Sequence, residues 1–380
     1  MRRGRSCASV GRLTMSKARK PKSPRAATLA DVGREAGVSA MAASAVLNSV
    51  KTSSRISADT RTRILEAAAR LQYRPNAAAR ALVHRRMNTI GLVAEVDEND
   101  LNYYFLALFN GVLTAATHYE QNTTVFTLKN WGKDIARLRS ICDGRIDGLI
   151  LIGPTFDAEQ LSDLPNHTPF VALHANAGLE QRMFNIESDE ELGAFRMTEH
   201  LIALGHRRIM HISGPTHMVG SQRRIAGYKR ALKAHGIKQE SRLLLHSHYD
   251  MLHGREIVSQ WLADHAGEAL PHAVFCGNDA MALGCMEALA EVGLRVPDDI
   301  SVAGFDDTLG ARTTVPQLCS VRQPLQEMGW KAAEILLAKI GTLKDEVPAS
   351  PFVMPVEVVP RGSAGPRPAV DRIVPMPRRS

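Results

Sequence analysis

The sequence of 380 residues lacks the features that define several large classes of protein. No stretch approaches about 18 consecutive apolar residues, which excludes a membrane-spanning helix. The five cysteines lie far apart and form no CxxC pair, so we expect reduced thiols in the cytoplasm, with no disulfide framework and no zinc site. The N-terminus is basic but no apolar segment follows it, so we expect no secretory signal. Aromatic residues make up only 5% of the chain, yet 44% hydrophobic and 23% charged residues are ordinary values for a folded protein.

Common catalytic motifs are also missing, because the chain contains no GxxxxGK[ST], no GxGxxG after a strand, no GxSxG and no HExxH. His246, His248 and His253 have a spacing that could hold a metal, but no cysteine or acid completes the set, and surface histidines are the simpler interpretation. Asp306 and Asp307 follow an expected strand, where they could serve acid–base chemistry, bind ligand hydroxyls or cap the next segment. The sequence therefore favours a protein that is not an enzyme, with no cofactor and no bound metal.

Positive charge is abundant and unevenly distributed. Residues 1–27 carry nine basic and no acidic side chains, and residues 28–86 carry ten basic and four acidic ones. Residues 361–380 carry a further net charge of +4, which leaves −11 for residues 87–360 out of the total of +8. A basic head on an acidic body is typical of a polyanion-binding module joined to another domain, although a basic disordered tail without a specific partner would explain residues 1–27 alone.

Residues 28–74 are predicted to form three short helices. Thr28 can cap a first helix, which Gly37 ends. A second helix is expected over Ala40–Leu47 and a third from Ser57. A second helix that follows the first after a glycine turn is the arrangement of helix-turn-helix domains, although many small helical bundles would also match it. The local excess of basic residues favours DNA binding.

From Thr89 onward, short apolar runs alternate with amphipathic stretches. This alternation predicts an α/β protein with parallel sheets covered on both faces, and its length predicts two doubly wound subdomains. The expected strands cover 89–93, 123–128, 148–152, 170–173, 208–212, 273–276 and 300–304, and the clearest helices cover 192–204, 225–235, 280–292 and 327–340. Ligands of such sheets lie beyond the carboxyl ends of the strands, so a small-molecule site is expected between the two subdomains.

We expect the following domain organisation. A basic disordered tail (1–27) precedes the helix-turn-helix domain (28–74), and a hinge helix and linker (75–86) leads to a core (87–360). Within the core, one subdomain covers about 87–187 and 322–345 and the other covers about 188–321. Residues 361–380 are rich in proline and arginine and are expected to form a second disordered tail.

Six motifs, the last of which consists of two segments, resemble the LacI/GalR family of bacterial transcriptional repressors. They lie in the order that the family has and together cover about residues 28–340. The segments are 28–48 (TLADVGREAGVSAMAASAVLN), 71–82 (LQYRPNAAARAL), 147–150 (DGLI), 204–209 (LGHRRI), 224–228 (RIAGY), and 275–282 (FCGNDAMA) with 296–307 (VPDDISVAGFDD). The resemblance implies a homodimer that binds a palindromic DNA operator through paired helix-turn-helix heads, with a core like the periplasmic sugar-binding proteins.

The family resemblance also assigns residues to DNA. Ala40–Leu47 would be the recognition helix in the major groove, with Ala40, Met41 and Ala45 as its exposed base-reading positions. Ser39, Ser44 and Asn48 would contact phosphates, and Arg34 would contribute electrostatically. In the hinge, Asn76 and Ala79 would lie at the DNA, and Leu82 would enter the minor groove as an apolar wedge unless it is an ordinary linker residue.

The recognition helix departs from the family pattern, which commonly reads T-V-S-R-V-L-N after V-S-x-x. Here Ala42 removes a hydroxyl, Ala43 shrinks a core residue and Ala45 replaces an arginine that can bond guanine. The apolar readers could touch thymine methyl groups but offer no hydrogen bonds. These changes indicate an unusual operator, a weak head, greater reliance on the hinge and basic tail, or loss of DNA binding.

For a small-molecule effector, the resemblance implies contacts from both core subdomains. The matching positions are Asn102, Tyr104, Arg224, Tyr249, Asn278 and Asp306, together with His174 where the family often has aspartate. An arginine, an asparagine, an aspartate and aromatic rings suit a sugar or polyol, and a sugar acid paired with Arg224 is equally allowed. The leading hypothesis is a cytoplasmic, ligand-controlled repressor associated with the nucleoid. The alternatives are a cytoplasmic solute-binding protein that has lost specific DNA recognition and a sugar-modifying enzyme.

Overall fold

The computed structural model describes residues 26–48, 56–74, 86–96, 102–162, 164–175 and 183–376. The chain forms two compact units, residues 1–85 and 86–380. Each described unit has its own hydrophobic core. The expected basic tail, except for residues 26 and 27, and the expected hinge through residue 85 lie outside the described residues.

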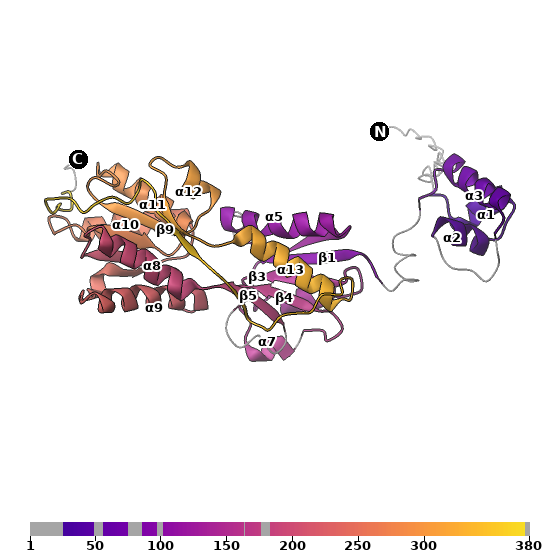
Figure 1. Cartoon of the computed structure of the whole chain (residues 1–380), viewed down its shortest axis with the longest axis horizontal. Coiled ribbons are helices and arrows are strands. Elements are labelled where there is room, and N and C mark those ends of the chain that lie inside the picture. The colour runs from indigo at the N-terminus through magenta and orange to yellow at the C-terminus, as the bar shows by residue number, and fades with distance from the viewer. Residues whose placement is uncertain are drawn as a thin grey trace, which may run out of the picture. The chain divides into compact units, whose positions relative to one another are not determined.

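The first unit contains the three helices that the sequence predicts: α1 (Leu29–Ala36), α2 (Ala40–Leu47) and α3 (Ala58–Arg70) (Figure 1). The Thr28 side chain accepts a hydrogen bond from the Asp31 amide, and the Asp31 side chain bonds the Thr28 amide in return, which completes a capping box. Gly37 ends α1 with φ of 69°, a conformation that favours glycine. Ala43, Val46 and Ile64 meet in the core between the helices, so the alanine at position 43 is indeed a core residue.

The second unit contains two six-stranded sheets (Figure 1). The first has the strand order β11-β5-β4-β3-β1-β2 and is parallel throughout. The second has the order β12-β10-β9-β8-β6-β7 and is parallel except for the antiparallel edge strand β12. The strands are β1 (Thr89–Glu95), β2 (Asn122–Leu128), β3 (Gly148–Ile152), β4 (Phe170–Leu173), β5 (Phe184–Ser188), β6 (Ile209–Ser213), β7 (Leu244–His246), β8 (Ala273–Cys276), β9 (Ser301–Asp306), β10 (Cys319–Arg322), β11 (Phe352–Met354) and β12 (Glu357–Val359).

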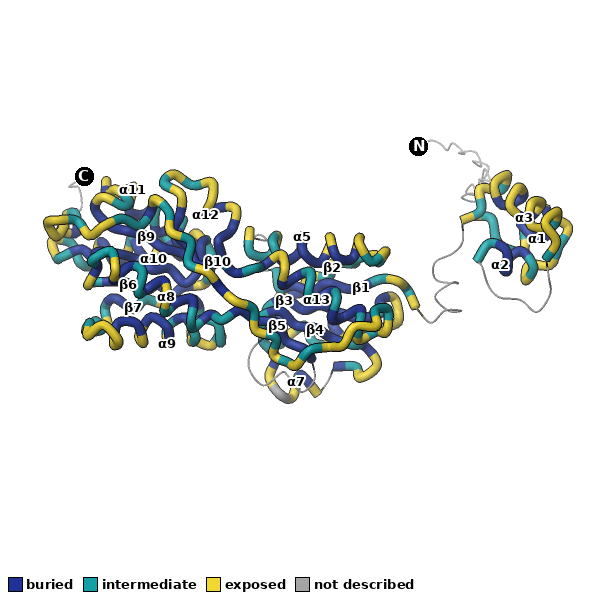
Figure 2. The backbone as a smooth tube through the Cα atoms, viewed as in Figure 1, coloured by how far each residue is buried: buried dark blue, intermediate teal, exposed yellow. Residues whose placement is uncertain are grey.

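Helices cover these sheets, and the inner strands are the most deeply buried elements (Figure 2). Helices α5 and α13 pack together over the first sheet, while the pairs α8–α9 and α10–α11 belong to the two cores of the second sheet. The helical elements are α5 (Tyr103–His118), α6 (Ile135–Ile141), α7 (Ala158–Ser162), α8 (Glu190–Ala203), α9 (Val219–Ala234), the 3-10 turn η1 (Ser241–Leu243), α10 (Met251–Asp264), α11 (Asp279–Glu291), α12 (Leu309–Thr313) and α13 (Leu325–Lys339). The two doubly wound subdomains predicted from the alternating pattern are therefore confirmed.

The chain passes between the two subdomains three times. Two passages, after β5 and between β10 and α13, agree with the predicted boundaries near residues 188 and 322. The third lies between β11 and β12, so the first subdomain extends to Met354 and not only to about residue 345. Strands of three residues are too short to show an alternating pattern, which explains why the sequence did not predict this last passage.

The expectation of a disordered tail from residue 361 is wrong for residues 361–376, which pack on the second subdomain. Ser363 is fully buried and bonds Val302 and Cys319, while Ile373 forms a β-bridge with Ala269. Arginines of this segment find carboxylate partners, among them Arg372, whose Nε lies 2.9 Å from Asp299 Oδ1. A rule based on composition counts prolines and charges but does not include such specific partners.

Replacing Val374 with alanine should test this packing. Val374 is only 1% exposed and belongs to the core around β8 and β9, so the smaller side chain should lower the free energy of unfolding by about 1–2 kcal/mol. Val370→Ala is the matched control, because Val370 is 74% exposed in the same segment and its truncation should change stability by less than about 0.5 kcal/mol. Urea titrations of the full chain would measure both. Equal effects of the two substitutions would contradict a packed segment.

Candidate functional site

Helix α2 exposes a small apolar surface at its start. Ala40 is exposed and Met41 is 78% exposed, as expected for base-reading positions. The prediction that Ala45 is exposed is wrong, because this residue is only 7% exposed. Position 45 therefore offers little surface to a base. Side-chain length is not the reason, because Ala40 has the same methyl group on the same helix and is exposed.

The polar residues of this head are engaged with the protein itself. Ser39 Oγ accepts a hydrogen bond from the Ala42 amide at 3.1 Å and caps α2, while Asn48 Nδ2 donates to Ser44 Oγ at 3.0 Å. Arg34 is exposed and pairs with Asp31, with 3.2 Å between Nη1 and Oδ1. Phosphate contacts from these four residues remain predictions. The hinge residues Asn76, Ala79 and Leu82 lie outside the described residues.

The expected effector residues come together in the second unit. We call the following set the central polar cluster: Tyr104, His174, Ser188, Glu190, Arg224, Tyr249, Asn278, Asp306 and Gln323. His174, Asn278 and Asp306 lie at the carboxyl ends of β4, β8 and β9, where parallel sheets place their ligands. Two of the predicted residues cap helices. Asn102 Oδ1 accepts from the Tyr104 and Phe105 amides of α5 at 3.1 and 3.4 Å, and Asn278 Oδ1 accepts from the Met281 amide of α11 at 2.9 Å.

Backbone strain is concentrated at this cluster. His174, Tyr249 and Asp306 have positive φ angles of 52°, 67° and 118°, and none of them is glycine. Such conformations cost free energy and are typical of functional sites, where the surrounding structure enforces them. The Tyr249 ring lies so close to the backbone of Gly214 that a methyl group at residue 214 would overlap it. The fold therefore positions these side chains at an energetic cost.

A chain of hydrogen bonds crosses the cluster from one subdomain to the other. Tyr104 Oη lies 2.6 Å from His174 Nδ1, and His174 Nε2 lies 3.3 Å from Ser188 Oγ. Ser188 Oγ in turn donates to Gln323 Oε1, and Gln323 Nε2 donates to Asp306 Oδ1 at 2.7 Å. Since the Ser188 hydroxyl proton goes to Gln323, His174 donates from Nε2 and accepts from Tyr104 at Nδ1. Burial lowers the pKa of His174 to about 4, which agrees with this neutral ring.

Sequence reasoning missed Ser188 and Gln323, although both lie at passages between the subdomains. Ser188 ends β5, and Gln323 directly follows β10. Neither strand was among the expected ones, so nothing in the sequence brought these two residues to the carboxyl edge of a sheet. The signal that could have found them is the alternation of apolar and polar residues directly before each one, over 184–187 and 319–322.

Arg224 is buried and its charge is already paired. Nη2 donates to Glu190 Oε1 at 2.8 Å, Nη1 donates to the Gly277 carbonyl, and the guanidinium lies 4.1 Å from the centre of the Phe305 ring. Within the described residues Nε has no hydrogen-bond partner. Glu190 is buried too and was not among the predicted residues. Burial raises the pKa of Asp306 well above its usual range, with the Asp279 and Glu190 charges adding to the effect.

The paired acids at the end of β9 have separate roles. Asp306 belongs to the central polar cluster, whereas the Asp307 side chain is fully buried among three arginines. Its carboxylate lies 3.1 Å from Arg312, 2.7 Å from Arg322 and 2.5 Å from Arg361. Asp307 therefore anchors α12, β10 and the C-terminal segment to one another.

The histidines with metal-like spacing are bonded elsewhere. His246 Nδ1 lies 2.7 Å from Ser213 Oγ, and His253 Nδ1 lies 2.6 Å from Asp250. In the described part of the chain, no group of three or more histidine, cysteine or acidic side chains is arranged to hold a metal ion. A search of the same residues finds no helix long and apolar enough to cross a membrane.

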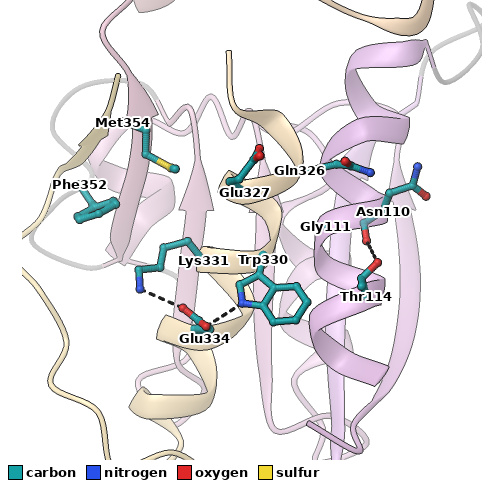
Figure 3. Close-up of a pocket in the computed structure, with 10 residues that line it drawn as sticks. All are labelled: Asn110, Gly111, Thr114, Gln326, Glu327, Trp330, Lys331, Glu334, Phe352 and Met354. Carbon is teal, nitrogen blue, oxygen red and sulfur yellow. Dashed lines mark hydrogen bonds and ion pairs between the residues drawn. The ribbon is translucent and has the colours of Figure 1, made fainter. Parts of the chain in front are cut away.

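A separate cavity of about 450 Å³ lies between α5, α13 and β11 (Figure 3). Trp330 Nε1 and Lys331 Nζ both donate to Glu334, at 2.7 and 2.9 Å, and form one wall. The remaining lining residues are Asn110, Gly111, Thr114, Gln326, Glu327, Phe352 and Met354. No member of the central polar cluster lines this cavity, so it is distinct from the expected effector site.

Comparisons with known protein families match both units. A family of bacterial regulatory proteins, the lacI family, matches residues 28–76. A periplasmic binding protein-like domain matches residues 198–364. Catabolite control protein A of Priestia megaterium is 31% identical over 81% of this chain and 91% of its own. The HTH-type transcriptional repressor PurR of Vibrio vulnificus is 30% identical over 83% of this chain and 92% of its own.

Two solved structures extend the comparison to three dimensions. A lac repressor dimer bound to operator and the anti-inducer ONPF has a TM-score of 0.76 and 27% sequence identity, covering 90% of this chain and all of its own. A complex of the transcriptional regulator CelR with cellobiose has a TM-score of 0.65 and 29% identity, covering 89% of this chain and 99% of its own. The similarity thus includes both the head and the core.

Proposed function

Because the chain belongs to the lacI family of bacterial regulatory proteins, we propose that it is a sequence-specific DNA-binding repressor whose operator affinity is controlled by a sugar-like effector bound between the two core subdomains. The observation that carries this proposal is the central polar cluster, which joins both subdomains in a chain that also has a helix-turn-helix head. Strained, buried polar side chains at the carboxyl ends of parallel strands are what a ligand-controlled core requires.

The effector is a neutral sugar or polyol. Arg224 would be the partner of a sugar acid, but Glu190 already pairs with its guanidinium. Within the described residues Nε of Arg224 has no partner, and it remains, with Asp306, to bond hydroxyl groups. Asn278 is engaged with the protein, because its Oδ1 caps α11 and its Nδ2 donates to the Tyr249 carbonyl. Tyr104 and Tyr249 provide ring faces. The cellobiose complex of CelR supports a neutral carbohydrate as the ligand class. We therefore favour the neutral alternative over the acid.

Effector control would act as a shift between two arrangements of the subdomains. The chain of hydrogen bonds from Tyr104 to Asp306 joins the subdomains at the passages. A second contact is made by the ring of Tyr103 in the first subdomain, which packs close to Gly310 in the second. A methyl group added at Gly310 would lie 3.2 Å from Cδ2 of Tyr103. A ligand that binds one arrangement better changes their populations. A coupling of roughly 1–3 kcal/mol would change operator affinity about 5- to 150-fold.

The partners we propose are a second copy of the chain and a palindromic operator. The lac repressor dimer bound to operator supports both, because two related heads read two related half-sites. Asn76, Ala79 and Leu82 would then act at the DNA from the hinge, with Leu82 as the minor-groove wedge. Binding to an operator would place the protein in the cytoplasm, on the nucleoid.

Selection of genomic DNA fragments on the purified full-length protein, at near-physiological salt, would test this function. We expect a recurring palindrome with a central pyrimidine–purine step, at which the Leu82 wedge can kink the duplex. Retention should then change in the presence of one neutral member of a panel of sugars, polyols and sugar acids. Fragments retained without sequence preference would contradict the repressor and favour the alternative, a solute-binding protein that has lost specific DNA recognition.

A further inference from the structure

The start of α2 exposes an apolar surface in the described head. No acidic or basic residue lies in the first or last turn of α2, whose sequence is AMAASAVL. Met41 is 78% exposed, while the other strongly exposed large apolar side chain of the head, Leu65 on α3, is 49% exposed. An apolar side chain held so far out in water gains free energy when an apolar partner covers it.

The serine oxygens on either side of Met41 already accept hydrogen bonds within the head. Ser39 Oγ caps the helix at the Ala42 amide, and Ser44 Oγ accepts from Asn48 Nδ2. The position that could carry a longer reader, residue 45, is a buried alanine. Side chains that bond guanine or adenine through two hydrogen bonds are arginine, lysine, asparagine and glutamine, and α2 contains none of them.

We infer that Met41 reads the operator through the C5 methyl group of a thymine. This inference rests on the proposed function, since it assumes that α2 enters the major groove. Among the groups that base pairs present there, the thymine methyl is the apolar one, so it is the partner that an apolar helix surface can distinguish. The flexible thioether side chain of methionine adapts its shape to such a contact. Affinity comes from elsewhere, chiefly from the net charge of +6 on residues 28–86.

Two features of the operator follow. Each half-site contains a thymine at one fixed position, opposite Met41. Changes at the guanines and cytosines around this thymine should weaken binding less than they do in operators that are read by arginine. Discrimination at the thymine is also modest, because the contact involves one methyl group. A buried methyl group corresponds to roughly a threefold to fivefold change in affinity.

The test uses full-length protein and a random pool of double-stranded DNA, from which the preferred site is selected. In that site each thymine is then replaced, one at a time, by deoxyuridine, which keeps every hydrogen bond of the base pair and removes only the methyl group. We expect one position per half-site at which this replacement weakens binding about threefold to fivefold. Met41→Ala should weaken binding to the thymine site by a similar factor and should abolish the effect of deoxyuridine at that position.

Leu65→Ala is the matched control, because it removes an exposed apolar side chain from another helix of the same head. It should leave the deoxyuridine effect unchanged. A selected site whose affinity is insensitive to deoxyuridine at every thymine would overturn the role of Met41 while leaving the repressor function in place. Equal sensitivity in the wild type and in Met41→Ala would do the same. A pool that yields no preferred site would contradict the proposed function itself, and the inference with it.

Discussion

Replacing Glu190 with alanine should lower the free energy of unfolding by about 3–5 kcal/mol. The reason is the charge that remains: Arg224 stays buried over the Phe305 ring after its carboxylate partner, 2.8 Å away, is removed. Breaking a buried ion pair from one side costs more than the pair itself contributes, because an uncompensated charge is left in a poorly solvated place. Urea titrations of the full chain would measure the loss.

The neighbouring residue provides the control. Glu191 pairs with Arg230 on the surface, where both side chains are exposed, so Glu191→Ala should cost less than about 1 kcal/mol. Adding Arg224→Met to Glu190→Ala removes the unpaired charge and should restore much of the lost stability. If the single and the double variant are equally unstable, the charge on Arg224 is not the cause and packing around Gly220, which contacts Glu190, becomes the explanation.

Glu190 also has a consequence for ligand choice. In the wild type the Glu190 carboxylate accepts a hydrogen bond from Arg224, the arginine of the central polar cluster that an acidic ligand would use. In Glu190→Ala, sulfate as a probe anion should therefore stabilise the protein more than it stabilises the wild type. The same stabilisation in both would contradict our preference for a neutral effector.

The sequence predicted elements best where a local signal specifies them. Helices α1 and α2 follow from Thr28, Gly37 and Ser39, which act through the nearest backbone amides. Strands such as β3 are uninterrupted apolar runs because they are buried on both faces of a sheet. Short edge strands and the packed segment after residue 361 have no such signal, because distant partners such as Ala269 and Asp299 create them.

The residues of the candidate site likewise fall into those that a sequence motif identifies and those that only the structure identifies. Family resemblance located Arg224, Asn278 and Asp306, since each lies within a motif long enough to recognise. It did not locate Glu190 or Gln323, whose importance comes only from what they bond in three dimensions. Ala45 was assigned to the surface from its place in a motif, but the packed structure leaves it only 7% exposed, whereas Ala40 on the same helix is exposed.

Lowering the pH from 7.5 to 5 should destabilise the core through its buried histidines. Burial lowers the pKa of His174, His206 and His211 to about 4 in the folded protein, whereas the unfolded chain has a histidine pKa of about 6.5. Between these two values the unfolded chain binds more protons, so stability falls as the pH falls. Each histidine should lower the free energy of unfolding by roughly 2 kcal/mol by pH 5. Burial raises the pKa of Asp279 to about 6 and the pKa of Asp306 well above its usual range, and both carboxyls act in the opposite direction; Asp279 alone offsets roughly 1 kcal/mol.

His211→Phe isolates one of these contributions. The His211 ring stacks on Tyr228 with 5.0 Å between ring centres, and its Nδ1 donates to the Phe275 carbonyl at 2.8 Å, so phenylalanine replaces it at similar volume. Between pH 7.5 and pH 5 the free energy of unfolding of the variant should fall by about 2 kcal/mol less than that of the wild type, as measured by urea titrations at both pH values. Val370→Ala should leave the wild-type slope unchanged, because it truncates an exposed side chain and removes no titratable group. A slope that His211→Phe also leaves unchanged would mean that the acid sensitivity of the core comes from other groups.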